Sequence, residues 1–265
     1  MKNRSWWIYI LIFFVSQLTA VGITMGSVLI NGREAASSTT LAVWALFTAN
    51  VLGILLWLLF RPKDVTWQRT MNGLRGTNGR RSKLVFGLAL GVIPLVNILQ
   101  EAIFPDIPNL IPEETMMAIM YNPIGILAVA LIGPICEELL FRGGVQHDIQ
   151  KRFISQGPAI AIGFSAILFS LIHMNPAQMP AAFILGVVLG FAYWWTGSLV
   201  APVCIHVFNN SFACTLGLLA PDDDSFIHFI GGNQAAVITA AASALWLILM
   251  LHLIRQEMKK STEID

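Results

Sequence analysis

Two glutamates and an arginine interrupt an apolar stretch near the middle of the chain. Glu137, Glu138 and Arg142 fall within six positions of one another. On a helix, Glu138 and Arg142 are four residues apart and share a face, so we expect them to form an ion pair. Glu137 points about 100° away from Glu138 and has no cation nearby in sequence. The spacing therefore predicts that Glu138 has a structural role and that Glu137 is available for acid–base chemistry.

Polar side chains also occur in two later apolar stretches. Phe169 and His173 are four residues apart in the first of these, and His206 and Asn210 are four apart in the second. Glu137 and His173 each lie 18 residues from Ser155, where a helical hairpin is expected to turn. That register predicts equal depth on antiparallel neighbours and a polar cavity between helices. A helix-end charge cluster with hydrogen-bonded packing histidines is the structural alternative.

The segments that carry these residues are long enough to cross a bilayer. The chain of 265 residues is 56% hydrophobic and 12% charged, whereas soluble domains carry about 25% charged residues. Eight apolar stretches approach the roughly 20 residues that a transmembrane helix needs. They lie near Trp6–Ile30, Thr39–Phe60, Leu84–Phe104, Tyr121–Phe141, Gly157–Asn175, Ala177–Trp195, Leu199–Ala220 and Ala235–Ile254. The predicted fold class is an all-α, polytopic membrane bundle of about eight helices.

The charges predict the orientation of this bundle. If the N-terminus is inside, 14 of the 16 Lys and Arg fall on cytoplasmic segments, whereas the outer loops and adjoining span ends carry Arg33 and eight acids. Cytoplasmic loops are enriched in basic residues. A multi-pass protein of the cell membrane with both termini in the cytoplasm is therefore expected. Asn97, Gln100 and Glu101 then fall near the outer end of the third span, where we expect water to reach them.

Ionisable residues inside such a segment need a reason to be there. Insertion of a charged side chain at mid-membrane costs about 2.5–3.5 kcal/mol, and intramembrane charges commonly mark functional sites. The sequence places Glu137, Glu138 and Arg142 in the fourth predicted span, His173 in the fifth and His206 in the seventh. We therefore expect the chemistry of this protein to lie among these three spans.

The ordered motifs resemble those of a known family. Glu137-Glu138-x-x-Phe141-Arg142, Phe169-x-x-x-His173 and His206-x-x-x-Asn210 are similar to the motifs of the CPBP family. This family includes the type II CAAX prenyl proteases and the bacterial abortive-infection and bacteriocin-immunity proteins. The resemblance covers about Ile124–Cys214, roughly a third of the chain.

The resemblance implies an intramembrane endopeptidase of the glutamic type. It makes Glu137 the general base that activates water, with His173 helping to hold the water. It makes His206 and Asn210 the donors that stabilise the oxyanion, a task that suits an amide and an imidazole N–H. Glu138, Arg142 and Phe169 are implied to shape the site.

The predicted organisation places this site in a central segment. Residues 1–120 are expected to hold helices 1–3 with a basic cytoplasmic loop, 121–220 the catalytic core, and 221–265 the last helix and a cytoplasmic tail. The expected partners are a peptide or protein substrate in or at the membrane and the membrane lipid. No nucleic-acid partner and no cofactor are expected.

Four alternative functions remain open at this point. A zinc protease would use Glu137 or Glu138 with His173 and His206, which is a legitimate ligand set although no HExxH motif is present. Cysteine catalysis by Cys136 has no indicated partner. A membrane scaffold or bacteriocin-immunity protein would keep the fold without turnover, and a transporter would use the Glu and His residues as a proton relay. The sequence does not identify the substrate or say whether it is prenylated.

Overall fold

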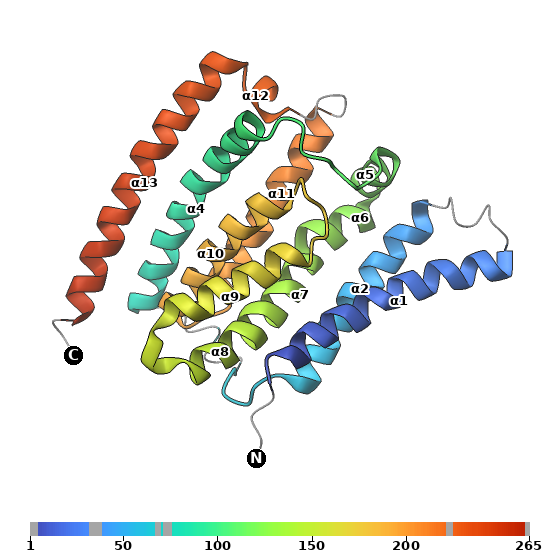
Figure 1. The fold of residues 1–265 in the computed structure, drawn as a ribbon, viewed down its shortest axis with the longest axis horizontal. Coiled ribbons are helices and arrows are strands. Elements are labelled where there is room, and N and C mark those ends of the chain that lie inside the picture. The colour runs from blue at the N-terminus through green and yellow to red at the C-terminus, as the bar shows by residue number, and fades with distance from the viewer. Residues whose placement is uncertain (1–4, 32–38, 67–69, 71–75, 221–224, 263–265) are drawn as a thin grey trace. The chain divides into compact units, whose positions relative to one another are not determined.

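The computed structural model describes residues 5–31, 39–66, 70, 76–220 and 225–262, which form helices joined by turns and loops and contain no strand (Figure 1). The longer helices are α1 (Trp7–Asn31), α2 (Thr39–Phe60), α4 (Gly76–Ile103), α9 (Pro158–Leu171), α10 (Met179–Thr196), α11 (Val200–Leu219) and α13 (Asn233–Thr262). The shorter elements are α5 (Glu113–Met120), α6 (Pro123–Leu127), η2 (Ala128–Ile132), α7 (Gly133–Leu140), η3 (Phe141–Gln146), α8 (His147–Arg152), η4 (Ile154–Gln156) and α12 (Phe226–Phe229). The predicted all-α fold class is confirmed.

Seven helical stretches of the described residues are long and apolar enough to cross a membrane. They correspond to seven of the eight predicted spans, so the chain is a multi-pass membrane protein. The span predicted over Gly157–Asn175 is the exception, because α9 has only 14 residues. At 1.5 Å per residue such a helix covers about 21 Å, less than the hydrocarbon core of about 30 Å. The predicted Tyr121–Phe141 span, in contrast, continues as a helical run to Arg152.

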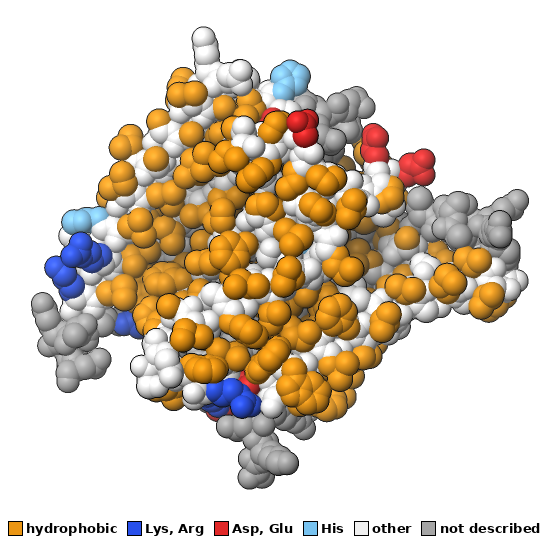
Figure 2. Space-filling view, viewed as in Figure 1, with side chains coloured by type: hydrophobic (Ala, Val, Ile, Leu, Met, Phe, Trp, Pro, Cys, Tyr) orange, Lys and Arg blue, Asp and Glu red, His pale blue; other side chains and the backbone are white. Residues whose placement is uncertain are grey.

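Large apolar side chains lie on the outside of these helices. On α13, Val237, Ile238 and Leu245 are each about 70% exposed. Figure 2 shows hydrophobic side chains over most of the face in view, with the charged side chains near helix ends. Apolar patches of this extent are unusual on a soluble monomer. The surface therefore fits contact with lipid.

Contacts divide the chain into two compact units. The first comprises Met1–Val65, Ile111–Ala161 and His206–Pro221. The second comprises Thr66–Leu110, Ile162–Ile205 and Asp222–Asp265.

Glycines allow close helix packing in the first unit. A Cβ at Gly53 of α2 would lie 2.5 Å from Sγ of Cys136 on α7, and one at Gly144 of η3 would lie 2.4 Å from the ring of Tyr9 on α1. Real Cβ atoms essentially never approach other atoms this closely, so a side chain at either position would force its neighbour to move. The helical run of residues 123–152, which carries the two glutamates, is thereby held directly against α1 and α2 (Figure 1).

That helical run contains two π-helical segments, η2 and η3, on either side of α7. Pro134, at the start of α7, explains the first of them. Proline has no N–H and its ring clashes with the carbonyl four residues earlier, so regular α-helical bonding cannot pass through this position. The Gly133 N–H instead bonds the Ala128 carbonyl, five residues back. Such π segments frequently accompany functional sites.

The second unit is built around α4. Helix α13 packs along it, and the Trp246 indole Nε1–H donates a 2.6 Å hydrogen bond to the Gly87 carbonyl. Helix α10 packs on α4 as well. Helix α4 thus provides a frame for the segment between α9 and α10, which contains His173.

Candidate active site

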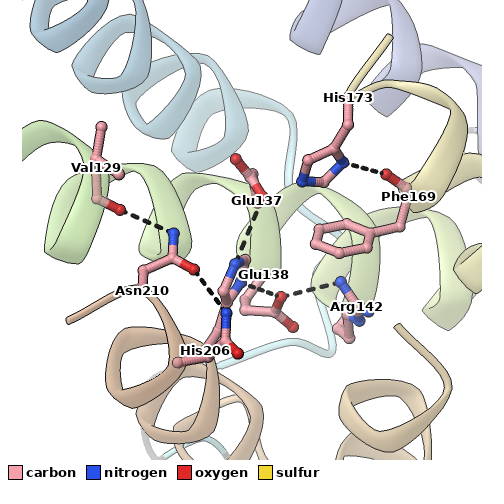
Figure 3. Close-up of polar contacts among 9 residues, drawn as sticks. Val129, Glu137, Glu138, Arg142, Phe169, His173, His206 and Asn210 are labelled. Carbon is pink, nitrogen blue, oxygen red and sulfur yellow. Dashed lines mark hydrogen bonds and ion pairs between the residues drawn. The ribbon is translucent and has the colours of Figure 1, made fainter. Parts of the chain in front are cut away.

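Glu138 is the centre of a buried ionic cluster in the first unit (Figure 3). Its Oε1 accepts a 2.9 Å hydrogen bond from Nη1 of Arg142 and lies 2.9 Å from Nδ1 of His206. Glu138 and Arg142 are fully buried, and His206 is 2% exposed. The ion pair predicted from the four-residue spacing is confirmed.

The contact with Glu138 determines the tautomer of His206. A carboxylate oxygen only accepts hydrogen bonds, so Nδ1 of His206 must carry a proton and donate it. In the neutral ring Nε2 is then the acceptor nitrogen, and protonation of Nε2 turns the ring into a donor on both sides. Glu138 therefore orients the ring of His206, as buried carboxylates do for catalytic histidines.

Nε2 of His206 faces the second glutamate. It lies 3.8 Å from Oε2 of Glu137, whose side chain is 21% exposed. This Oε2 is a buried atom that makes no hydrogen bond. Polar atoms separated by more than 3.5 Å can be connected by a water molecule that contacts both. The side chain of Glu137 is thus partly exposed and has one oxygen without a hydrogen bond, whereas the side chain of Glu138 is fully buried.

Asn210 lies one helical turn beyond His206 and is held by backbone. Its Nδ2 donates a 2.9 Å hydrogen bond to the carbonyl of Val129 in η2, and its Oδ1 accepts a 3.1 Å bond from Nδ2 of Asn209. In the π-helical register, Val129 would bond the N–H of residue 134, which is proline. The helix interruption at Pro134 therefore leaves a carbonyl that Asn210 binds, and this contact fixes the orientation of the amide.

His173 belongs to the second unit and lies in the turn that follows α9. Its Nδ1 is 2.8 Å from the carbonyl oxygen of Phe169, and the two rings meet edge to face with centroids 5.0 Å apart (Figure 3). Because a carbonyl only accepts, Nδ1 carries the proton and Nε2 is the acceptor nitrogen of the neutral ring. The hydrogen bond and the ring contact hold His173 against Phe169.

The structure thus brings together five of the seven predicted site residues in the first unit: Glu137, Glu138, Arg142, His206 and Asn210. Phe169 and His173 form a pair within the second unit. Two residues that support the site, Val129 and Pro134, were not predicted from the sequence. A proline within an apolar helical stretch is the signal that points to them, because it must leave carbonyls without helical partners.

Two of the alternatives, cysteine catalysis and a zinc site, depend on side chains that the structure describes. Cys136 is a buried free thiol beside Glu137. Within the ranges that the structure describes, no group of three or more His, Cys, Asp or Glu side chains is arranged to hold a metal ion.

The fold and these contacts define a multi-pass helical membrane protein with a buried carboxylate–imidazole–amide cluster. Residues 120–212 match the family of Rce1-like type II CAAX prenyl endopeptidases. The chain is also similar to the "Membrane-embedded CAAX protease MroQ" of Staphylococcus aureus (strain USA300), with 33% identity over 113 residues. That match covers 42% of this chain and 46% of the relative, so the chain spans about half the length of the curated relative it matches. No solved structure matches the chain.

The family match falls on the segment that carries the motifs. The matched family segment, residues 120–212, contains all seven predicted site residues. The resemblance to the CAAX-protease family that the motifs predicted is therefore confirmed.

Proposed function

We propose that this chain is an intramembrane endopeptidase that hydrolyses a peptide bond with water activated by Glu137. One observation carries the proposal: Oε2 of Glu137 is buried without a hydrogen bond and lies 3.8 Å from Nε2 of His206. The neighbouring carboxylate, Glu138, also has an Oε2 without a hydrogen bond, but it is fully buried and its Oε1 already receives Arg142 and His206. A water beside Glu137 would therefore meet a carboxylate that is free to take its proton.

The reaction would proceed through a tetrahedral intermediate. Glu137 would accept a proton from the water while the water oxygen forms a bond to the peptide carbonyl carbon. The proton would then pass to the amide nitrogen as the C–N bond breaks, which releases an amine and a carboxylic acid. General base catalysis of this kind contributes about 10²–10⁴-fold in rate. The resemblance of its motif makes His173, with Nε2 as its acceptor nitrogen, a further proposed participant in the reaction.

His206 and Asn210 would stabilise the oxyanion. The second amide hydrogen of Asn210 is available while the first is donated to Val129. His206 would donate from Nε2 when both of its ring nitrogens carry a proton, while Nδ1 stays bonded to Glu138. Each such donor is worth about 3 kcal/mol in the transition state. Arg142 and Phe169 would act indirectly, by fixing Glu138 and His173.

The proposed substrate is a peptide or protein in or at the membrane. The similarity to type II CAAX prenyl endopeptidases and to a membrane-embedded CAAX protease supports this substrate class. The apolar exterior of the helices is suited to a substrate that arrives through the lipid. We also propose that residues 121–220 form the catalytic core and that both termini lie in the cytoplasm.

The proposed mechanism needs no metal, so the experiment compares it directly with the zinc alternative. The detergent-solubilised protein is incubated with a mixture of prenylated and unprenylated peptides, and the products are read by mass spectrometry. We expect cleavage that resists chelators, less than stoichiometric metal, and a loss in kcat of about 10²–10³-fold for Asn210→Ala. One zinc per active chain, or full activity of Asn210→Ala, would refute the mechanism. Absence of cleavage by the wild type would favour a scaffold or immunity protein.

A further inference from the structure

The chain reverses direction sharply after His173. Helix α9 ends at Leu171, and Met174 has φ = 50°, the one positive value for a non-glycine residue in the described part of the chain. Residues other than glycine seldom occupy this left-handed region. The Asn175-Pro176 sequence ends the helix, because a residue before proline avoids the helical conformation. His173 is thus placed by a turn that local preferences alone would not favour.

The side chain of Asn175 secures this turn from one side. It is 2% exposed. Its Oδ1 accepts a 3.1 Å hydrogen bond from the backbone N–H of Leu110, and its Nδ2 donates a 2.9 Å bond to Oδ1 of Asn109. Both partners belong to the segment between α4 and α5. Asn175, which follows Met174 directly, therefore attaches the turn to the segment between α4 and α5.

Gln100, near the end of α4, secures the turn from the other side. Its Nε2 donates a 2.7 Å hydrogen bond to the carbonyl of Ala177, and its Oε1 accepts a 3.2 Å bond from the N–H of Ala181. Gln100 thus connects the loop after Asn175 with the first turn of α10. The polar end of α4 serves as an anchor for this loop, whereas the sequence indicated only a water-accessible helix end.

We propose that Asn175 and Gln100 are positioning residues for His173. The inference rests on the proposed function for its catalytic meaning, because it assumes that His173 takes part in the reaction. The two amides maintain the left-handed turn at Met174, and the turn keeps Nδ1 of His173 on the Phe169 carbonyl. Without them the backbone at Met174 relaxes, and His173 loses both its location and its single tautomer.

The kinetic test uses Asn175→Ala and Gln100→Ala. A misplacement of about 1 Å can reduce a rate by about 10²-fold, so we expect kcat to fall by about 10- to 100-fold while KM changes by less than about twofold. Asn97→Ala is the matched control. Asn97 is an amide on the same helix, and its Nδ2 bonds the Ile93 carbonyl of its own helix. This control should retain the wild-type kcat.

A spectroscopic test follows the tautomer without reference to activity. In protein labelled with ¹⁵N-histidine, the signal that disappears in His173→Gln identifies this ring. We expect one Nδ1–H tautomer in the wild type and a mixture in Asn175→Ala and Gln100→Ala. Should Asn175→Ala fail to fold, Asn175→Asp takes its place, because it keeps the acceptor for Leu110 and replaces the donor to Asn109 with a carboxylate oxygen.

The outcomes separate this inference from the proposed function. Wild-type kcat in the folded variants overturns the positioning role and leaves the function standing if Glu137→Gln is inactive. A fall in kcat with an unchanged His173 tautomer also overturns it, because the loss would then act by another route. An inactive wild type refutes the proposed function, while the tautomer signal still decides whether these amides hold His173.

Discussion

Nδ2 of Asn210 donates a 2.9 Å hydrogen bond to the carbonyl oxygen of Val129. This contact depends on a third residue, because Pro134 cannot supply the N–H that the π-helical register would direct to that carbonyl. A proline in one helix thereby orients an amide on another helix of the first unit. The orientation matters because an oxyanion donor must point to where charge develops in the transition state.

Pro134→Ala tests this connection. The new N–H at residue 134 can bond the Val129 carbonyl and displace Asn210, so we expect kcat to fall by about tenfold or more without loss of folded protein. Pro123→Ala is the control, since Pro123 occupies the first residue of α6, where a helix N–H has no intrahelical partner. Equal kcat values for Pro134→Ala and the wild type would show that the Val129 contact does not position Asn210.

A second prediction concerns the buried pair of Glu138 and Arg142. Glu138→Ala removes the acceptor of two donors and leaves Arg142 buried without its carboxylate, which costs about 3–5 kcal/mol for pairs of this kind. We expect a large loss of folded protein, measured by thermal unfolding in detergent. Glu138→Leu combined with Arg142→Met removes both charges and should restore the folded amount but not activity, because His206 still lacks its partner. An active double variant would contradict the role of Glu138 in orienting His206.

The features that could be predicted from the sequence are those that depend on local spacing. Runs of about 20 apolar residues predict spans directly, and a separation of four residues predicted the contact of Glu138 with Arg142. Asn210 was identified as a site residue, but its bond to Val129 depends on a π-helical register that the spacing of apolar residues in the sequence does not reveal. The partners of Gln100 are 77 and 81 residues away in sequence. Such contacts follow from tertiary packing, so spacing alone could not predict them.

The orientation of the chain in the membrane is a third prediction. The excess of basic residues on one set of segments places Lys63 in the cytoplasm and Glu113 outside. Both side chains are exposed. A membrane-impermeant thiol reagent should label Glu113→Cys in intact cells and Lys63→Cys only after permeabilisation, with the parent chain as the background control. The reverse labelling pattern would invert the topology.

A fourth prediction concerns Asp64, which lies outside the predicted spans. Partial burial raises the pKa of its carboxyl, but the hydrogen bond from Lys151 and the charge of His147 lower it more, so the net pKa is below 3.8. The Nζ of Lys151 and Nε2 of His147 lie 2.6 and 3.0 Å from its Oδ2. A lowered folded pKa contributes stability above the unfolded pKa, and that stability is lost as pH falls through the folded value.

The measurement is thermal unfolding in detergent as a function of pH. The wild type should unfold at a higher temperature than Asp64→Asn near neutral pH, and the difference should shrink below about pH 4. Asp106→Asn, at an exposed acid in the loop after α4, provides the control and should show no such trend. A difference between wild type and Asp64→Asn that is constant down to pH 2.5 would show that this carboxylate is not stabilised by its partners.

The central claim is that Glu137 activates the water, and Glu137→Gln tests it most directly. Glutamine keeps the size of the side chain and removes its basicity, and the absence of a hydrogen bond to Oε2 means that folding loses no such partner. The measurement is kcat of purified Glu137→Gln on a peptide that the wild type cleaves, with the unfolding temperature recorded beside it. We expect an unfolding temperature close to that of the wild type and a fall in kcat of at least about 10²-fold. A folded Glu137→Gln protein with near-wild-type kcat would contradict the account.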